Sequence, residues 1–561
     1  LNTNQDIKKV KRRIESSAPT ETENIINKLP SLNPGQFLLI SPDEYDSAQN
    51  ISIRWLLSKH PLIIPENKLK NLNSKKIKNY YLSKAEQFKK ILLDDGSTAQ
   101  NSDPTAYPAP GLSAENTLRT GDTVNAVTGV VTYSFSTYRI HPTVTPQFIA
   151  TNAREDAPEQ SEEADLRIAS FNVLNYFNGD GQGGGFPTSR GADSEEEFVR
   201  QEAKLVSAIS AMQADVVGLM EIENDGFGDD SAIQSLVNAI NAELGETEQY
   251  AFVATSDGSE IGTDAITVGL LYKASVVTPE SDAMIVDMPV QQIDEDSLAR
   301  MRPSLLQSFV HNESSKSFLV AVNHFKSKGS QCAEDVAEAP SEITTIQGSC
   351  NALRVSAAIT LGNALSDESL PERKVILGDL NAYSAEDPVA VLTDYTPESR
   401  GYTIATAINT GMDEGASVDV ESSFGYHNLA EEFDAEGFSY WFYGTEQVGS
   451  LDHVLASDAM LADAIDGAHW NINSVEAYQL QYDQALRFYP EEEGYAFTDV
   501  GPFRSSDHDP FIATFDLQAD VVEDDEDDNK DSSGGAMGGI FALLAAMVGF
   551  RRRQHNVEKK S

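Results

Sequence analysis

Six short apolar runs between about residue 166 and residue 517 end in side chains that hold metals or move protons. These side chains are Asn172, Glu221, His324, Asp379 with Asn381, Asp452 with His453, and Asp507 with His508. Apolar runs of this length are typical of buried strands. We expect the polar groups that follow them to meet at one end of a sheet and to form a single site.

These residue types suit the hydrolysis of a phosphodiester. That reaction needs a cation to neutralise the phosphate, a base to activate water and a group to orient the base. Hard divalent cations prefer oxygen ligands. Five of the side chains offer such oxygens: Asn172, Glu221, Asp379, Asn381 and Asp507. His324 and His508 offer imidazoles that titrate near neutral pH, and Asp452 offers a carboxylate to fix the tautomer of one of them.

Each motif has an ordinary structural interpretation when it is taken alone. Asn172 after a strand is usual in a turn, and Glu221 at the end of an apolar run is usual at a surface. The pair Asp507–His508 is compatible with a purely structural contact. The ordered combination of all six motifs is what favours a catalytic site.

The elements around the motifs indicate a layered α/β domain. Ser194 to Glu197 form a capping box, and apolar residues follow it at helical spacing up to Met212. A strand is predicted over 216–220 and a second helix over 351–365. Alternating helices and strands of this kind are typical of helices packed on sheets.

Composition divides the 561 residues into several parts, as a chain longer than one average domain predicts. We expect a Lys/Asn-rich segment of unknown role at 1–92, a small β unit at 93–150, a linker at 151–165, a catalytic domain at 166–517, an acidic linker at 518–533 and a terminal signal at 534–561. The β unit is compatible with part of an OB-like barrel. Its Tyr133, Phe135 and Tyr138 either stack on nucleobases or pack a β core.

The net charge of −47 is unevenly distributed along the chain. The first 95 residues hold 16 of the 41 basic residues but only 11 of the 88 acidic ones. An acidic body repels nucleic acids and anionic membranes at long range. A polyanionic substrate must therefore be met by local basic groups and by divalent cations.

Two further features concern the compartment of the protein. Cys332 and Cys350 are close in sequence, and a disulfide between them would contribute roughly 3 kcal/mol in an oxidising compartment; two free thiols are the alternative. Gly534 and Gly535 precede an apolar run over 536–550 that ends in three arginines. The run is shorter than the about 20 residues of a stable span, so it suits either a temporary membrane anchor or a buried core helix.

Together the six motifs resemble the endonuclease/exonuclease/phosphatase superfamily over about residues 166–517. The resemblance implies a four-layer αββα sandwich. It also implies metal binding by Asn172, Glu221 and Asp507, and catalysis by the remaining motif residues: His324, Asp379, Asn381, Asp452 and His508. His453 is expected outside the reacting centre. Lys326 and Lys328 are expected to contact phosphate, with solvated loop lysines as the alternative.

The segments 323–328 and 94–100 resemble large extracellular nucleases of marine gamma-proteobacteria, which carry an OB-like domain before the catalytic body. The tail resembles a GlyGly-type sorting signal, which implies a transient inner-membrane segment, a rhomboid-like protease and type II secretion. We therefore expect a secreted, monomeric enzyme that hydrolyses DNA, and RNA as a second substrate, with Mg²⁺ or Mn²⁺; Ca²⁺ is a further candidate ion. The alternatives are a phosphatase or phospholipid phosphodiesterase of the same fold and a non-catalytic DNA-binding surface protein.

Overall fold

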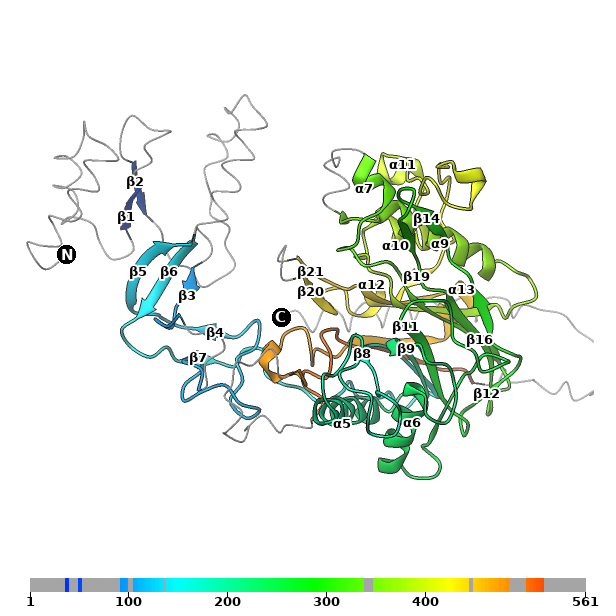
Figure 1. Ribbon diagram of the computed structural model, residues 1–561, viewed down its shortest axis with the longest axis horizontal. Helices are drawn as coiled ribbons and strands as arrows, with labels where there is room; N and C mark the ends of the chain where they lie inside the picture. The colour runs from blue at the N-terminus through cyan, green and yellow to red at the C-terminus, as the bar shows by residue number, and fades with distance from the viewer. Residues whose placement is uncertain are drawn as a thin grey trace, which may run out of the picture. The chain divides into compact units, whose positions relative to one another are not determined.

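The computed structural model describes residues 36–39, 49–52, 91–98, 104–135, 137–337, 347–442, 447–483 and 501–518. Two mixed β-sheets form the centre of the part that carries the six motifs (Figure 1). Leu1–Leu517 form one compact unit, and a second unit begins at Gln518.

The first sheet has six strands in the order β10-β11-β9-β8-β24-β23. Their bounds are β8 Leu166–Tyr176, β9 Val216–Glu223, β10 Tyr250–Phe252, β11 Ile266–Lys273, β23 Ala464–His469 and β24 Phe511–Phe515. Only the pair β8–β9 is parallel. Both strands are almost wholly buried, as expected of strands that are covered on both faces.

The second sheet has the order β12-β16-β17-β18-β22-β19, with β13 also paired to β16. Its bounds are β12 Val277–Pro279, β13 Met284–Val286, β16 Ser304–His311, β17 Ser317–His324, β18 Arg373–Asp379, β19 His427–Asn428 and β22 Asp452–Ala456. The pair β17–β18 is parallel. Two short hairpins accompany this sheet: β14 Val290–Gln292 with β15 Leu298–Arg300, and β20 Tyr440–Phe442 with β21 Gln447–Gly449.

Helices cover the outer faces of both sheets (Figure 1). Helices α5 (Glu195–Met212) and α6 (Ala232–Glu243) pack on the first sheet, and α9 (Asn351–Leu365) and α10 (Asp387–Leu392) pack on the second. A third apolar core joins the two sheets face to face. The four-layer αββα sandwich predicted from the sequence is therefore confirmed.

Shorter helices connect these layers. They are α7 Ala333–Ala337, α11 Pro397–Arg400, α12 Leu429–Phe433, α13 Asp458–Asp463 and the 3₁₀ turns Asp413–Gly415 and Tyr478–Leu480. The predicted helix over 351–365 is α9, and the predicted cap of α5 is present, because Ser194 accepts a hydrogen bond from the Glu197 N–H. The Glu197 carboxylate accepts from the Asp193 N–H at 2.7 Å.

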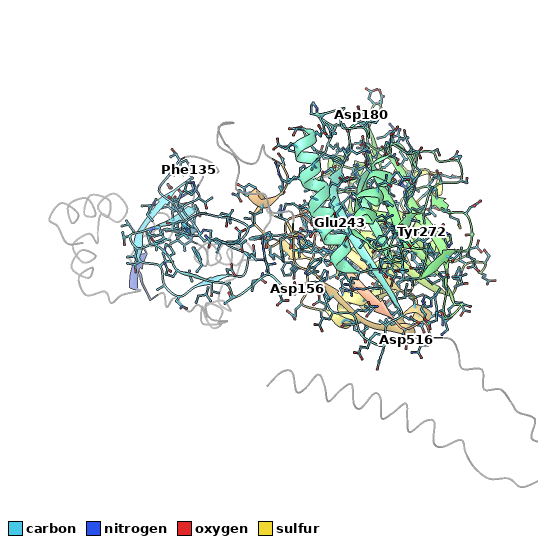
Figure 2. The ribbon with its side chains drawn as sticks, turned by 90° about the horizontal axis from the view of Figure 1, so that it is seen from below. Phe135, Asp156, Asp180, Glu243, Tyr272 and Asp516 are labelled. Atoms are coloured by element: carbon cyan, nitrogen blue, oxygen red, sulfur yellow. A yellow bond between two sulfur atoms is a disulfide. The ribbon has the colours of Figure 1, made fainter. Side chains whose placement is uncertain are left out.

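The upstream β unit forms small sheets in the described residues. Strands β3 (Leu92–Leu93), β6 (Thr137–Pro142) and β5 (Gly129–Ser134) form one sheet, and β4 (Thr123–Val124) pairs with β7 (Phe148–Ile149). No closed barrel is formed within 91–98, 104–135 and 137–150, so the OB-like barrel stays a prediction. Phe135 is 89% exposed at the end of β5 (Figure 2).

Two segments bear on the remaining predictions about organisation. Strands β1 (Gln36–Leu39) and β2 (Gln49–Ser52) form a hairpin within the Lys/Asn-rich segment. The described part of the chain contains no helix long and apolar enough to cross a membrane. The predicted terminal signal over 534–561 lies outside the described residues.

Candidate active site

The register of the strands brings the predicted residues to one edge of both sheets. His324 lies opposite Asp379 at the ends of β17 and β18, and Asp379 lies opposite Asp452 at the start of β22. In the first sheet, Asn172 and Glu221 lie near the ends of β8 and β9. His508 lies three residues before β24, which runs antiparallel to β8 and starts at that same edge.

Irregular backbone aims the first-sheet residues into the site. The pairing of β9 with β11 shifts between Thr267 and Val268, which leaves Glu221 without a direct partner in the ladder. Glu221 also has a φ of 68°, a region that side-chain-bearing residues seldom occupy. A bulge of this kind turns a side chain out of the regular alternation, and here it turns the Glu221 carboxylate toward Asn172.

Glu221 and Asp379 approach each other across the two sheets through Asn172. The Asn172 amide donates to the Glu221 carboxylate at 3.3 Å and lies 3.5 Å from the Asp379 carboxylate. Glu221 also accepts from the Asn175 N–H at 3.1 Å. Burial raises the pKa of Glu221, and the nearby charge of Asp507 raises it further. Three carboxylates thus share one poorly solvated region.

His508 and Asp452 form a buried pair. Nδ1 of His508 lies 2.6 Å from the Asp452 carboxylate, so it donates its proton there and leaves Nε2 toward Asp379, 3.9 Å away. Ser439 fixes the Asp452 backbone by accepting from its N–H at 3.1 Å, and the Tyr440 ring lies 4.4 Å from the imidazole. Burial alone would lower the pKa of His508, but the surrounding carboxylates raise it well above the usual value.

Asp379 is the centre of the second-sheet contribution. Its carboxylate accepts from the Asn381 N–H at 2.8 Å and from the Asn381 amide at 3.1 Å. Burial raises the pKa of Asp379 to about 7. His324 Nε2 lies 3.6 Å from the same carboxylate, and burial together with Arg302 holds the pKa of His324 well below its usual value. His324 is therefore a neutral imidazole.

The predicted phosphate contact Lys326 lies in a basic cluster beside His324, whose two arginines were not predicted. Arg190 and Arg302 both pair with Asp264, at 3.0 and 3.2 Å, and Lys326 is half-buried beside them. The charge of Arg302 also acts on Glu221. Two arginines that are far apart in sequence do not form a motif, so sequence inspection does not place them together. The one available hint was Arg302, a positive charge that follows an acidic stretch and directly precedes Pro303 and a strand.

Lys328 lies in a different environment from the one expected. Its ammonium forms a buried ion pair with Glu386, with one N–O distance of 2.6 Å, and lies over the Tyr383 ring. Because this charge is already neutralised, we do not place Lys328 on the substrate. His453 is also buried and bonds to the Ala382 carbonyl at 2.7 Å, outside the reacting centre.

A second set of buried polar groups holds the segment that carries His508. The Asn473 amide donates to the His508 carbonyl at 2.6 Å, and Asp509 accepts from the Asn473 N–H at 2.6 Å. Glu476, three residues further, pairs with Arg119 and Arg154 from the upstream segment, each at 2.9 Å. Sequence inspection gave no signal for these contacts, and Arg154 and Glu476 are 322 positions apart.

The donor set fits a divalent cation. Within the described residues, groups of Asp379, Asp452 and His508 lie within 4.8 Å of one another. Asp452 Oδ1 is buried there without a hydrogen-bond partner, and an unpaired buried carboxylate oxygen is costly. Carboxylate and carboxamide oxygens are the ligands that Mg²⁺ and Mn²⁺ prefer. Besides burial, the charge of Asp507 raises the pKa of Glu221, and that of Glu221 raises the pKa of Asp379, so a cation between these three carboxylates and beside the His508–Asp452 pair would relieve their repulsion.

No protein-family model matches the chain, and no curated protein matches its sequence. Among solved structures, a humanized D. rerio TDP2 is 14% identical, with a TM-score of 0.34, over 62% of this chain and 98% of its own. An endonuclease/exonuclease/phosphatase family protein from Bacteroides thetaiotaomicron is 12% identical, with a TM-score of 0.35, over 63% and 98%. ANGEL2, a 2′,3′-cyclic phosphatase, is 13% identical, with a TM-score of 0.36, over 62% and 94%. Because these similarities are low, we base the function on the geometry of the site.

Proposed function

We propose that the protein is a divalent-metal-dependent phosphodiesterase that hydrolyses nucleic acid, with DNA as its main substrate. The observation that carries this proposal is the meeting of the Glu221 and Asp379 carboxylates with the His508–Asp452 pair at one sheet edge. A buried base that is oriented by a carboxylate, next to a cluster of oxygen ligands, is the arrangement that metal-assisted hydrolysis needs.

Glu221 is the principal ligand for the cation in this proposal, with Asn172 and Asp507 beside it. A bound Mg²⁺ or Mn²⁺ would neutralise the phosphate and the charge that develops on the leaving oxygen. Asp379 and Asn381 orient the attacking water, since their side chains are already fixed to each other.

His508 acts as the general base. Because Nδ1 gives its proton to Asp452, the tautomer is set and Nε2 is the atom that takes a proton from water. The imidazolium that forms is stabilised by the buried Asp452 carboxylate. The surrounding carboxylates raise the pKa of His508, and a cation that neutralised them would lower this pKa and favour the form that accepts a proton.

His324 is the group that contacts the scissile phosphate. It is neutral and buried, and it lies between the carboxylate cluster and the basic cluster of Arg190, Arg302 and Lys326. A neutral imidazole can donate a hydrogen bond to a phosphate oxygen without adding a second full charge. The basic cluster offsets the repulsion that the acidic body exerts on a polyanion.

We also propose that the enzyme acts outside the cell. Three features support this: the Cys332–Cys350 disulfide, the acidic composition, and the Gly-Gly, apolar and arginine-rich order of the last residues. In this proposal a rhomboid-like protease removes the tail and type II secretion exports a monomer. Metabolic labelling with fractionation tests it, because mature enzyme confined to the cytoplasm would contradict secretion.

The experiment that tests the activity is incubation of the full chain with linear and circular double-stranded DNA, in Mg²⁺, in Mn²⁺ and in EDTA. We expect metal-dependent loss of both substrates, and loss of several orders of magnitude in rate for Glu221→Ala and for His508→Ala. Loss of the circle establishes internal cleavage. Intact DNA under all metals would overturn the nuclease assignment, and hydrolysis of phosphomonoesters or sphingomyelin instead would favour the phosphatase or lipid alternative.

A further inference from the structure

The segment 325–332, which we call the strap, leaves the active site directly after His324 and ends at the disulfide. It is tied to the site at its start: the Phe325 N–H donates to the Asp379 carbonyl at 2.9 Å, and the Asn381 amide donates to the Phe325 carbonyl at 3.1 Å. The first residue of the strap is therefore bonded to two residues that carry the proposed chemistry.

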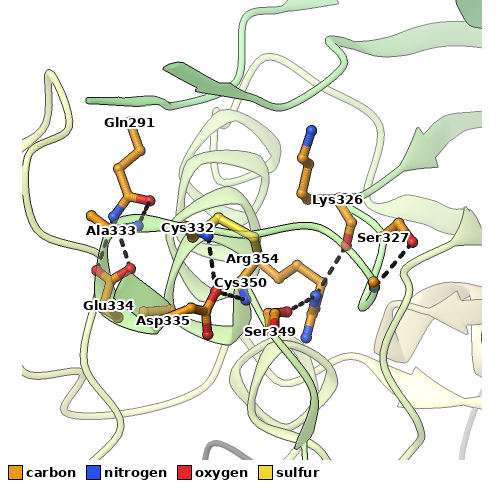
Figure 3. Close-up of a disulfide and its surroundings, with 12 residues drawn as sticks. Gln291, Lys326, Ser327, Cys332, Ala333, Glu334, Asp335, Ser349, Cys350 and Arg354 are labelled. Atoms are coloured by element: carbon orange, nitrogen blue, oxygen red, sulfur yellow. Dashed lines mark hydrogen bonds between the residues drawn. A yellow bond between two sulfur atoms is a disulfide. The ribbon is translucent and has the colours of Figure 1, made fainter. Parts of the chain in front are cut away.

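Arg354 holds the middle of the strap from below (Figure 3). This fully buried guanidinium donates to the Lys326 carbonyl at 3.0 Å and to the Ser349 carbonyl at 2.8 Å. The Ser349 N–H in turn donates to the Lys328 carbonyl at 3.2 Å, and the Lys328 side chain pairs with Glu386. The backbone of the strap is thus bonded along most of its length.

The disulfide fixes the far end of the strap. Cys332 and Cys350 are both buried, and their Cα atoms lie 5.0 Å apart. Asp335 accepts from the N–H groups of both cysteines at 2.9 Å, so one carboxylate binds the two ends of the bridge (Figure 3). Cys350 directly precedes α9, the helix that carries Arg354, so the disulfide and the arginine belong to one assembly.

Lys326 is the charged group that this assembly presents to the site. Its carbonyl faces Arg354, whereas its side chain extends to the opposite side (Figure 3). There it lies near Arg302 and Arg190, whose charges, after burial, lower its pKa. The cluster thus holds three cations, of which the two arginines share Asp264, next to the Glu221 and Asp379 carboxylates of the site.

We propose that Lys326 binds a phosphate of the substrate next to the scissile one, and that the disulfide and Arg354 are positioning groups that hold it there. This inference rests on the proposed phosphodiesterase activity and deepens it. The strap then selects polynucleotides, which carry flanking phosphates, over small diesters with a single phosphate. The charge of Lys326 acts on His324, and that of Arg302 acts on Lys326, so Lys326 lies beside the group that we place on the scissile phosphate.

The test compares two substrates, a short DNA duplex and bis(p-nitrophenyl) phosphate, with the full chain in Mn²⁺. Lys326→Met should raise the KM for DNA about tenfold, the effect of losing roughly 1.4 kcal/mol, with kcat unchanged. The dependence of log KM on log salt should become shallower by about 0.9, as expected for one lost contact with duplex phosphate. Turnover of the single diester should fall much less than the kcat/KM for DNA, because that substrate carries no flanking phosphate. Lys316→Met, at the opposite end of β17, is the matched control.

The positioning role is tested by a double-mutant cycle. Cys332→Ala/Cys350→Ala should raise the KM for DNA like Lys326→Met, and the combined variant should be no worse than Lys326→Met alone. Arg354→Met removes the hydrogen bonds to the Lys326 and Ser349 carbonyls and tests the same positioning role independently of the disulfide. Multiplying effects, or an equal loss on the single diester, would overturn positioning through Lys326, and an unchanged KM in Lys326→Met would overturn the contact itself. A wild-type protein that cleaves neither substrate refutes the proposed function instead.

Discussion

Replacing Asp452 with asparagine tests the role of His508 with little change in shape. The carboxylate lies 2.6 Å from Nδ1, and both side chains are less than a tenth exposed. Ser439 holds the backbone of residue 452, so the new amide should stay in place. The new amide can lie in two orientations. If its oxygen faces Nδ1, it accepts the hydrogen bond but lacks the negative charge that stabilises an imidazolium. If its NH₂ group faces Nδ1, it favours the tautomer with the proton on Nε2, which cannot take a proton from water.

Either orientation of the amide weakens the base. We expect kcat to fall about 10³-fold, or about 4 kcal/mol of transition-state stabilisation, as for other histidines that lose an orienting carboxylate. The sign of the pH effect also follows. Since the Asp452 charge raises the pKa of His508, its removal lowers that pKa and should move the acid limb of the kcat profile to lower pH.

The assay is steady-state hydrolysis of a DNA duplex at saturating Mn²⁺ between pH 5 and 9, with circular dichroism as the check on folding. Asp458→Asn is the matched control, because Asp458 also lies 2.6 Å from a histidine, His427, but at an exposed site. An exposed pair of this kind contributes little, so this variant should keep its rate and its profile. A folded Asp452→Asn enzyme within tenfold of wild-type kcat would refute the reasoning about His508.

Three further predictions concern the metal and the scaffold. Glu221→Gln should weaken Mn²⁺ binding at least tenfold by isothermal titration calorimetry, and unchanged affinity would remove Glu221 from the ligands. Because the pKa of Asp379 is raised to about 7, protons compete with the cation below that pH; Mn²⁺ affinity should rise from pH 6 to 7.5 with release of about one proton, and a flat profile would contradict this. Glu476→Gln leaves the buried charges of Arg119 and Arg154 uncompensated and should lower the free energy of unfolding by about 3 kcal/mol in urea; a change below 1 kcal/mol would show that the pairs are dispensable.

The layered fold could be predicted because its signals are local. The N-cap at Ser194 lies within one turn of α5, and the apolar runs that became β8, β9, β17 and β18 are continuous, as strands buried on both faces require. Once those strands are assigned, the polar residues that follow them must lie at the edge of the sheet where the strands end. The register of β8 and β9 brings Asn172 close to Glu221, whereas Asp379 reaches Asn172 because the two sheets pack face to face.

The local backbone of the site could not be predicted in the same way. Glu221 lies in a bulge with a positive φ, and Asn381 also has a positive φ of 46°. A glutamate after an apolar run carries no signal for such a conformation, which tertiary contacts must impose. The alternation rule would have placed Glu221 by counting along the strand, whereas the bulge decides which way its carboxylate faces.

The boundary that composition suggested before residue 166 does not match the way polar contacts are distributed. Arg119 and Arg154, upstream of that boundary, share the buried Glu476, and Trp470 donates to the Glu155 carbonyl at 3.0 Å. Glu476 belongs to the same segment that fixes His508 through Asn473. A linker that only joined two domains would leave its arginines solvated, whereas Arg119 and Arg154 contact the segment that holds His508. A change in composition shows which residue types a segment contains. Whether the segment belongs to a folded unit depends instead on the buried contacts it makes, such as the ion pairs of Arg119 and Arg154 with Glu476.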